Sequence, residues 1–349
     1  MKFNLAFYVH HHGAGHFTRT AQIITRLTGY HITLLGSNLK PFAHLLPKNI
    51  QVIHLPMDTE EVQDLYFHNG NTVDALHYAP LNVKGISDRV AIMTEFFRSA
   101  FPMVLVVDVS VEVTLLARLA GIPTIVMRQH GLRDDLPHLM AYQSAECLLA
   151  PFSSSIAPLS AKWVEEKTIY TGGFSRFSQS KSNIEIPHQV AVIVGSGGTS
   201  INTSFLEFLA ISSPDFYFLI IGKIEGKPIE HTHIEYLGHL DEPKEVLDQC
   251  CIVIGNTGHN TVMEMASLNK RFIGIPESRP FEEQVDKARA ITSIAGVRIV
   301  LPETLFQIHW NDLLNEMENT APNWKNTVTE TAVDDAAKAI VRVGERLYG

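Results

Sequence analysis

Cysteine is scarce in this chain, and a long uninterrupted apolar run is missing. Three cysteines in 349 residues are too few for a disulfide framework, so we expect reduced thiols. The longest apolar stretch, residues 101–123, is interrupted by three charged side chains, which argues against a membrane-spanning helix. The apolar stretch at the N-terminus is too short for a signal peptide. These features together predict a soluble cytoplasmic protein.

Lysine and arginine are also in deficit. The chain has 28 of them against 37 aspartates and glutamates, a formal net charge of −9. Proteins that bind nucleic acid neutralise phosphates with a surplus of Lys and Arg, so this balance argues against a nucleic-acid partner. An anionic ligand would have to be held by local backbone dipoles rather than by a general positive field.

Apolar sequence, in contrast, is plentiful: 45% of the residues are hydrophobic, which excludes a disordered chain. Short runs rich in Val, Ile and Leu alternate with amphipathic stretches, as in parallel sheets that are covered by helices on both faces. The length suits two such domains. The expected strands are residues 2–9, 31–36, 51–56, 103–108 and 122–127 in the first half, and 189–195, 216–222, 250–255 and 270–276 in the second.

The alternation of strands and helices stops in one place, residues 171–188, where the sequence is polar and rich in Gly and Ser. We therefore predict an α/β protein with two facing, doubly wound Rossmann-like domains, residues 1–170 and 189–325, joined by this connection. Residues 326–349 have helical periodicity and are expected to pack back across the domain junction. Ligands of open α/β sheets bind outside the carboxyl ends of the strands, so function is expected in the cleft between the domains.

The first strand leads into a loop with Gly13 and Gly15, followed by His16. Thr18 stands where a dinucleotide fingerprint has its third glycine, which disfavours an NAD-dependent oxidoreductase. The positive end of the next helix favours a neutral, proton-accepting imidazole, so His16 is a candidate general base, with helix capping as the alternative. The histidines at 10–12 would point alternately to opposite sides of a strand end, so we expect no metal site there.

Two loops of the second half are candidates for anion binding. Gly197, Gly198 and Thr199 follow a strand and can offer free backbone N–H groups, but the lysine of a P-loop is missing, which disfavours NTP hydrolysis. Residues 255–266, GNTGHNTVMEMA, predict a turn with capping Asn and Thr and a helix that begins near His259.

The N-terminus of that second helix is suited to a diphosphate, because its N–H groups and its dipole face an anion. Glu264 falls in the second turn, where a carboxylate can accept two hydrogen bonds from a ribose diol, or can be an ordinary solvated side chain. Polar residues at 277–287 follow the next strand, in the position that reads sugar hydroxyls.

These motifs together, residues 13–19, 195–199 and above all 255–266 with Pro276, Glu283 and Gln284, resemble the GT-B glycosyltransferases of the family-28 type. The resemblance extends over most of the chain, and residues 121–131 resemble the segment that ends the family's N-terminal sheet. It implies that the N-terminal domain holds the acceptor and the C-terminal domain the donor. The family is inverting and usually independent of metals, which fits the absence of an Asp-x-Asp motif.

The resemblance also assigns roles to residues. His16 would be the general base, beside Gly13 and Gly15 of the acceptor loop. Asn260 and the residues around it would hold the diphosphate, Glu264 the ribose, Gln284 and Glu283 the hexose, and the backbone of Leu240 the base. The full donor set is Gly197, Gly198, Thr199, Leu240, Thr257, Gly258, His259, Asn260, Glu264, Glu283 and Gln284.

The sequence thus predicts an inverting glycosyltransferase that moves a hexose from a nucleotide diphosphate sugar, expected to be a UDP-sugar, to an acceptor hydroxyl without a cofactor. The acceptor is a small molecule or is lipid-linked, which leaves peripheral contact with a membrane open. Two alternatives stand beside it: a nucleotide-sugar hydrolase with the same Gly-x-Gly-His-x-x-Arg loop, and a non-catalytic nucleotide-sugar-binding protein. His259, where the family has small residues, and Glu283, where it has Gln, are departures that bear on donor and acceptor.

Overall fold

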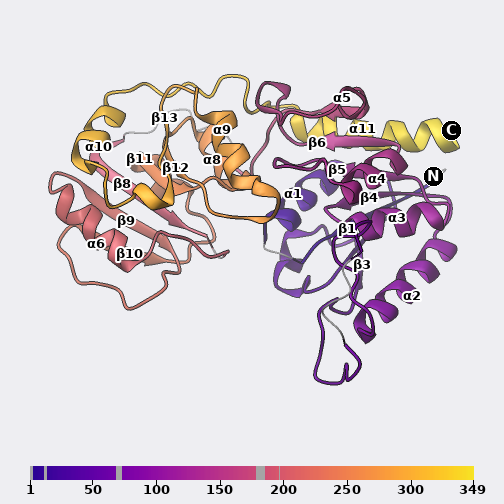
Figure 1. Cartoon of the computed structure of the whole chain (residues 1–349). Helices are drawn as coiled ribbons and strands as arrows, with labels where there is room; N and C mark the ends of the chain where they lie inside the picture. Colours follow the sequence, from indigo (N-terminus) through magenta and orange to yellow (C-terminus); the bar gives the residue numbers. More distant parts are fainter. Residues whose placement is uncertain (1–2, 12–13, 68–72, 178–184, 196) are drawn as a thin grey trace.

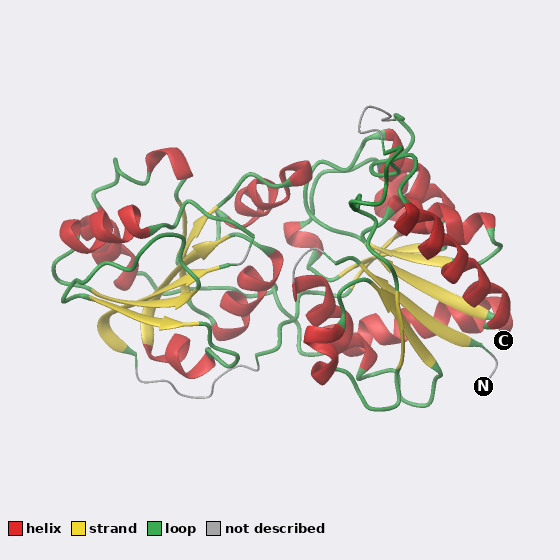
Figure 2. Ribbon diagram, turned by 90° about the horizontal axis from the view of Figure 1, so that it is seen from below, coloured by secondary structure: helices red, strands yellow, loops and turns green. Residues whose placement is uncertain are grey.

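The computed structural model describes residues 3–11, 14–67, 73–177, 185–195 and 197–349, and consists of two α/β domains (Figure 1). Both sheets are parallel, and helices cover them on both faces (Figure 2). The expected pair of doubly wound domains is therefore confirmed. Gly13, one of the predicted acceptor-loop glycines, lies outside the described residues, as does part of the predicted connection.

The first sheet has the strand order β3-β2-β1-β4-β5-β6-β7. Residues 121–131 do not end this sheet, contrary to the expectation, because β6 and β7 extend it beyond β5. The strands are β1 Asn4–Val9, β2 Ile32–Gly36, β3 Gln51–His54, β4 Met103–Asp108, β5 Thr124–Met127, β6 Cys147–Ala150 and β7 Thr168–Tyr170. The helices of this domain are α1 Ala14–Ile24, α2 Lys84–Ser99, α3 Val111–Leu119, α4 Leu136–Ser144 and α5 Lys162–Lys167, with short 3-10 helices at Lys40–Leu45 and Ser154–Ile156.

The second sheet has the order β10-β9-β8-β11-β12-β13. Its strands are β8 Ile186–Val194, β9 Tyr217–Gly222, β10 Ile234–Gly238, β11 Cys250–Asn256, β12 Arg271–Ile275 and β13 Val297–Ile299. Its helices are α6 Thr203–Ser212, α7 Lys244–Gln249, α8 His259–Leu268, α9 Glu283–Ile291 and α10 Trp310–Glu318, with 3-10 helices at Pro280–Glu282 and Pro302–Thr304. In both sheets the order reverses beside the first strand of the domain, which places a ligand crevice at the carboxyl end of that strand.

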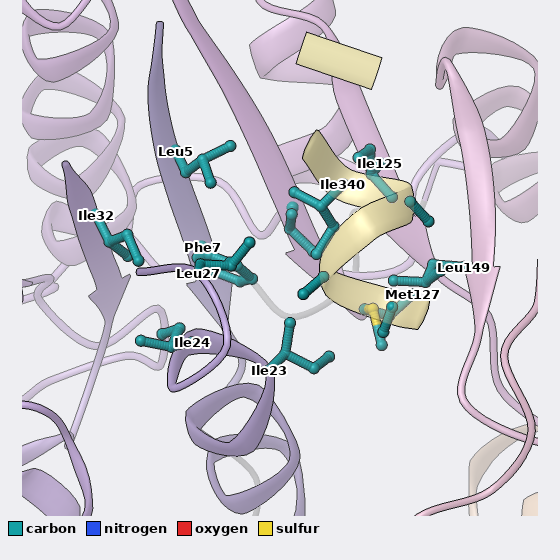
Figure 3. Packing of buried hydrophobic residues seen from close by; sticks show 14 of the residues in the cluster. Leu5, Phe7, Ile23, Ile24, Leu27, Ile32, Ile125, Met127, Leu149 and Ile340 are labelled. Atoms are coloured by element: carbon teal, nitrogen blue, oxygen red, sulfur yellow. The ribbon is translucent and has the colours of Figure 1, made fainter. Parts of the chain in front are cut away.

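The last helix, α11 (Ala332–Tyr348), packs against the first domain although it follows the second in the chain. Its side chain Ile340 lies in one buried cluster with Phe7 of β1, Ile23 of α1 and Ile125 of β5 (Figure 3). This helix therefore covers the same face of the first sheet as α1. None of the helices in the described part of the chain has the length and hydropathy that a membrane span requires.

A candidate active site between the two domains

His16 is the third residue of α1 and lies at the carboxyl end of the first sheet. Its Nδ1 is 3.2 Å from Oδ1 of Asp108, the last residue of β4, which pairs with β1. Its side chain is 20% exposed, and within the described residues its Nε2 has no hydrogen-bond partner. Nη2 of Arg19 and Nε2 of Gln129 also lie 3.3 Å from Nδ1, and Asp108 is the acceptor among these three neighbours. When the imidazole proton is on Nδ1 and points to Asp108, the lone pair of Nε2 is free to accept a proton.

Asp108 also contacts a cation, because Nη2 of Arg19 lies 2.5 Å from the same Oδ1. Burial of Asp108 raises its pKa, but the charge of Arg19 and the contact with His16 outweigh this and hold the pKa well below its usual range. The carboxylate is therefore ionised at neutral pH. Both Asp108 Oδ2 and Arg19 Nε are buried without a hydrogen-bond partner in the described chain, which is unusual in a structural core and typical of a functional site.

Helix α8 of the second domain begins opposite this group. Gly258 is its N-cap in an extended conformation and makes no side-chain cap, so the expectation of a capping Asn or Thr is wrong. Thr257 instead donates its hydroxyl to the carbonyl of Gln284. Asn260 lies in the first turn, and its Nδ2 is 3.4 Å from the carbonyl oxygen of Gly15. The N-terminus of α8, with its free N–H groups, thus directly faces the start of α1.

Glu264, in the second turn of α8, is not a solvated surface residue. Its side chain is 13% exposed and lies 2.8 Å from Nε of Arg176. Burial raises the pKa of Glu264, while Arg176 lowers it. Arg176 also donates to the carbonyl of Asp241, next to Leu240, so the predicted ribose and base residues do come together around one guanidinium.

The loop with Gly197, Gly198 and Thr199 is occupied by a carboxylate of its own domain. Glu277, which follows β12, accepts hydrogen bonds from Thr199 Oγ1 at 3.0 Å and from the backbone N–H of Ser200 at 2.5 Å. Gly198 is in the left-handed region, with a φ of +80°, and Arg279 donates to its carbonyl. The hydroxyl of Thr199 and the backbone N–H of Ser200, which an anion could use, are thus already paired with Glu277.

Glu283 and Gln284 begin α9, on the side that faces the first domain. Glu283 is 3.6 Å from the guanidinium of Arg133, a residue of the first domain. The Oε1 of Gln284 accepts from the backbone N–H of Glu277 at 3.0 Å, which leaves only its Nε2 for a ligand.

The two domains also touch beside α9. The backbone N–H of Gly131 donates to Asp286 at 2.9 Å, and that of Leu132 donates to the carbonyl of Phe281 at 2.7 Å. Gly131 has a φ of +104°, and a Cβ at this position would lie 2.4 Å from the carbonyl oxygen of Phe281. Only glycine allows the two backbones to approach this closely.

Two groups of side chains in the described ranges could hold a metal ion: His10, His11 and Asp58, and His77, Asp135 and His138. Asp58 in the first group is already paired with Arg89. In the second group, Nη1 of Arg133 lies 2.9 Å from His138 Nε2, so Nδ1 carries the proton and donates it to Asp135. A metal ion would need a free lone pair on His138, but Nε2 accepts from Arg133 and Nδ1 carries the proton. The second group is therefore better described as a hydrogen-bonded chain.

Sequence reasoning missed two residues of this site, Asp108 and Arg176, and gave Arg19 only as the last residue of the Gly-x-Gly-His-x-x-Arg loop. Asp108 could have been predicted from the sequence, since a carboxylate at the end of a buried central strand has few reasons to be there other than function. Arg176 carried no comparable signal. Arg176 lies in the polar segment 171–188 and reaches Glu264 across 88 positions of sequence.

Comparison with known proteins bears on the family and on the fold. Residues 190–341 match the model of the glycosyltransferase family 28 C-terminal domain. No curated protein sequence matches the chain significantly.

Solved structures share the whole fold at low sequence identity. A glycotransferase of kitacinnamycin is 13% identical with a TM-score of 0.68, over 99% of both chains. MurG of Acinetobacter baumannii is 14% identical with a TM-score of 0.64, over 97% of this chain and 99% of its own. The spinosyn rhamnosyltransferase SpnG, solved with thymidine diphosphate, has the same identity and TM-score over 97% of this chain and 95% of its own. Likeness at this level of identity establishes the fold.

Proposed function

Residues 190–341 match the glycosyltransferase family 28 C-terminal domain and the whole chain has the GT-B fold, and from that premise we propose that the protein is a glycosyltransferase that moves a hexose from a UDP-sugar to an acceptor hydroxyl with inversion. The observation that carries the proposal is the position of His16, held by Asp108 on one domain and facing the N-terminus of α8 on the other. A base and a diphosphate site that face each other across a cleft are what direct displacement at an anomeric carbon requires.

In this proposal His16 Nε2 accepts the proton of the acceptor hydroxyl while that oxygen attacks the anomeric carbon. The bond from the anomeric carbon to the diphosphate oxygen breaks, and its electron pair leaves with the nucleotide. The N–H groups at the start of α8, next to Gly258 and Asn260, receive the new negative charge. Asp108 stays ionised and stabilises the imidazolium that forms.

The donor assignments follow from the same arrangement. We assign the ribose to Glu264, with Arg176 moving its guanidinium toward the diphosphate when the diol takes its place. The hexose is assigned to Gln284 through its Nε2, and to Glu283. The nucleobase is assigned to the backbone near Leu240. Arg176 lies beside this backbone, because it donates to the carbonyl of the next residue, Asp241. No cofactor takes part.

Nucleotide preference is tested first by thermal shift with UDP, TDP, GDP, CDP, ADP and NAD. A ligand at 100 times its dissociation constant adds about 2.7 kcal/mol to the free energy of unfolding. We expect UDP to give the largest shift. Stabilisation by TDP alone would replace the UDP-sugar by a TDP-sugar, and stabilisation by NAD alone would refute a glycosyl donor.

Turnover is tested with a panel of UDP-hexoses, with and without hydroxyl acceptors, and the anomeric configuration of the product is read by NMR. We expect transfer with inversion, and a loss of ~10²–10⁴-fold in kcat for His16→Ala with donor affinity retained. Rapid donor cleavage without acceptor would favour the hydrolase. Nucleotide binding with no chemistry, unchanged by His16→Ala, would identify a binding protein.

A further inference from the structure

Two lysines are completely enclosed in the described chain, and they differ in their surroundings. Lys270 is 2.8 Å from a carboxylate oxygen of Glu185 and donates to two backbone carbonyls, so its charge is fully compensated. Lys287, on α9, is 1% exposed, and among the described residues its Nζ has a single hydrogen-bond partner, Nδ1 of His259 at 3.4 Å. A buried ammonium with so little compensation is costly to the fold.

The nearest carboxylates do not neutralise Lys287. Glu283 and Asp286 lie on the same helix, but Glu283 pairs with Arg133 and Asp286 accepts the backbone N–H of Gly131. Within the described residues, Glu283 forms its ion pair with Arg133, and no ion pair joins Glu283 or Asp286 to Lys287. Both acidic groups are thus engaged with the first domain.

Aromatic rings form the rest of the surroundings. The Nζ of Lys287 lies 5.3 Å from the centre of the Phe152 ring. His130, which is edge-on to Phe152, donates from Nε2 to the carbonyl of Ile156, and its Nδ1 is buried with no hydrogen-bond partner among the residues that the structure describes. Burial lowers the pKa of Lys287 to about 7, against the opposing effect of Glu283 and Asp286.

His259 connects this lysine to the interdomain site. It is the first residue of α8 and lines a small pocket together with Arg19, Asn260 and Glu264. Burial and the charge of Lys287 hold the pKa of His259 well below its usual value, so the ring is neutral. When Lys287 is charged it can only donate to Nδ1, and the one ring proton of His259 is then on Nε2, where it can be donated.

We propose that Lys287 and His259 form a relay of positive charge to the donor diphosphate, in which His259 Nε2–H donates to a phosphate oxygen and Lys287 holds the ring in that tautomer. The proposal rests on the proposed function, because it assumes a diphosphate at the start of α8. As the bond from the anomeric carbon breaks, its electron pair goes to the diphosphate oxygen, and both hydrogen bonds strengthen without net proton transfer. His259 would touch the substrate, and Lys287 acts through it as a positioning residue.

The relay predicts a proton that enters with the ligand. At pH 8 the side-chain amine of Lys287 is largely neutral in the free protein. A bound diphosphate raises its pKa, so the amine takes up a proton when the ligand binds. The charged and titratable groups around Lys287 are Glu283 and Asp286 on α9, Arg19 and His16 on α1, His130, Arg128 and Arg133 after β5, and His259 on α8. His259 stays neutral in this range because of its strongly lowered pKa.

The experiment is calorimetry of UDP binding at pH 8 in two buffers of different ionisation heat, on the whole chain and on Lys287→Met. We expect the wild type to take up a substantial fraction of one proton and the variant to take up none, with roughly tenfold weaker binding. With a UDP-sugar and acceptor, we expect kcat of Lys287→Met to fall by ~10²-fold. His259→Gln should lose the same proton uptake while Lys287 remains.

Lys270→Met is the matched control. It removes an equally buried lysine, so it should lower the unfolding midpoint yet leave the proton uptake unchanged. Equal proton uptake by the wild type and Lys287→Met, with equal kcat, would overturn the relay while leaving the glycosyltransferase proposal intact. Absence of binding of UDP, TDP, GDP, CDP and ADP to the wild type would overturn both together.

Discussion

Replacing Asp108 by Asn is the sharpest perturbation of the site, because it removes one charge and almost no volume. The carboxylate is 1% exposed, and the guanidinium of Arg19 beside it is 5% exposed at a distance of 2.5 Å. Without the carboxylate, Arg19 becomes an uncompensated buried charge. Breaking such a pair from one side typically costs about 3–5 kcal/mol, and we expect a loss of this size in the free energy of unfolding.

Urea unfolding of Asp108→Asn, Arg19→Met and the double variant measures this loss. The double variant should recover much of the stability, since no lone charge stays buried. The folded pKa of Asp108 is depressed, so its stabilisation is present above about pH 4 and is lost as the pH falls through the folded pKa. The difference between wild type and variant should therefore shrink in acid.

The same variant tests the role of the carboxylate in catalysis. Asn cannot stabilise an imidazolium at His16, so kcat should fall by ~10²–10⁴-fold at unchanged donor affinity. An Asp108→Asn variant with the same urea midpoint of unfolding as the wild type would refute the argument that Arg19 becomes an uncompensated buried charge. A variant with wild-type kcat would refute the assignment of His16 as a base oriented by Asp108.

Three further predictions concern the junction and the fold. Gly131→Ala forces a Cβ to within 2.4 Å of the carbonyl of Phe281 at a positive φ, so the domains should separate there and kcat/KM should fall about tenfold or more in steady-state assays. Gly344→Ala places a Cβ 2.2 Å from the ring of Phe3 and should displace α11 from the first sheet. We expect the free energy of unfolding, measured in urea, to fall by about 1–3 kcal/mol. An unchanged value would mean that α11 can shift to accommodate the methyl group. The folded pKa of Lys287 is about 7, below the usual 10.5, so between these values the unfolded chain binds the proton and the folded chain does not. The wild type should thus gain stability as the pH rises from 7 to 10 relative to Lys287→Met, whose urea midpoint lacks this component.

The strands and the start of α8 were predictable because their signals are local. Val- and Ile-rich runs of strand length predict β11 and β12, and Gly258 before a helical pattern marks the first turn that contains His259. The identity of the cap was predicted wrongly. Thr257 is drawn to the carbonyl of Gln284, which lies 27 positions away in the sequence, and such a competing acceptor has no local signal.

The sequence by itself determined two parallel α/β domains, the loops at the ends of their strands and the candidates His16 and Glu264, since these follow from periodicity and from glycines next to strands. Only the tertiary structure decided which partners those residues have. Asp108 reaches His16 across 92 positions, and Arg176 reaches Glu264 across 88. The tertiary structure also buries Lys287 beside His259 rather than in an ion pair with a carboxylate of the described chain. Such pairings depend on strand order and on the exclusion of water, which arise only when the two sheets are assembled.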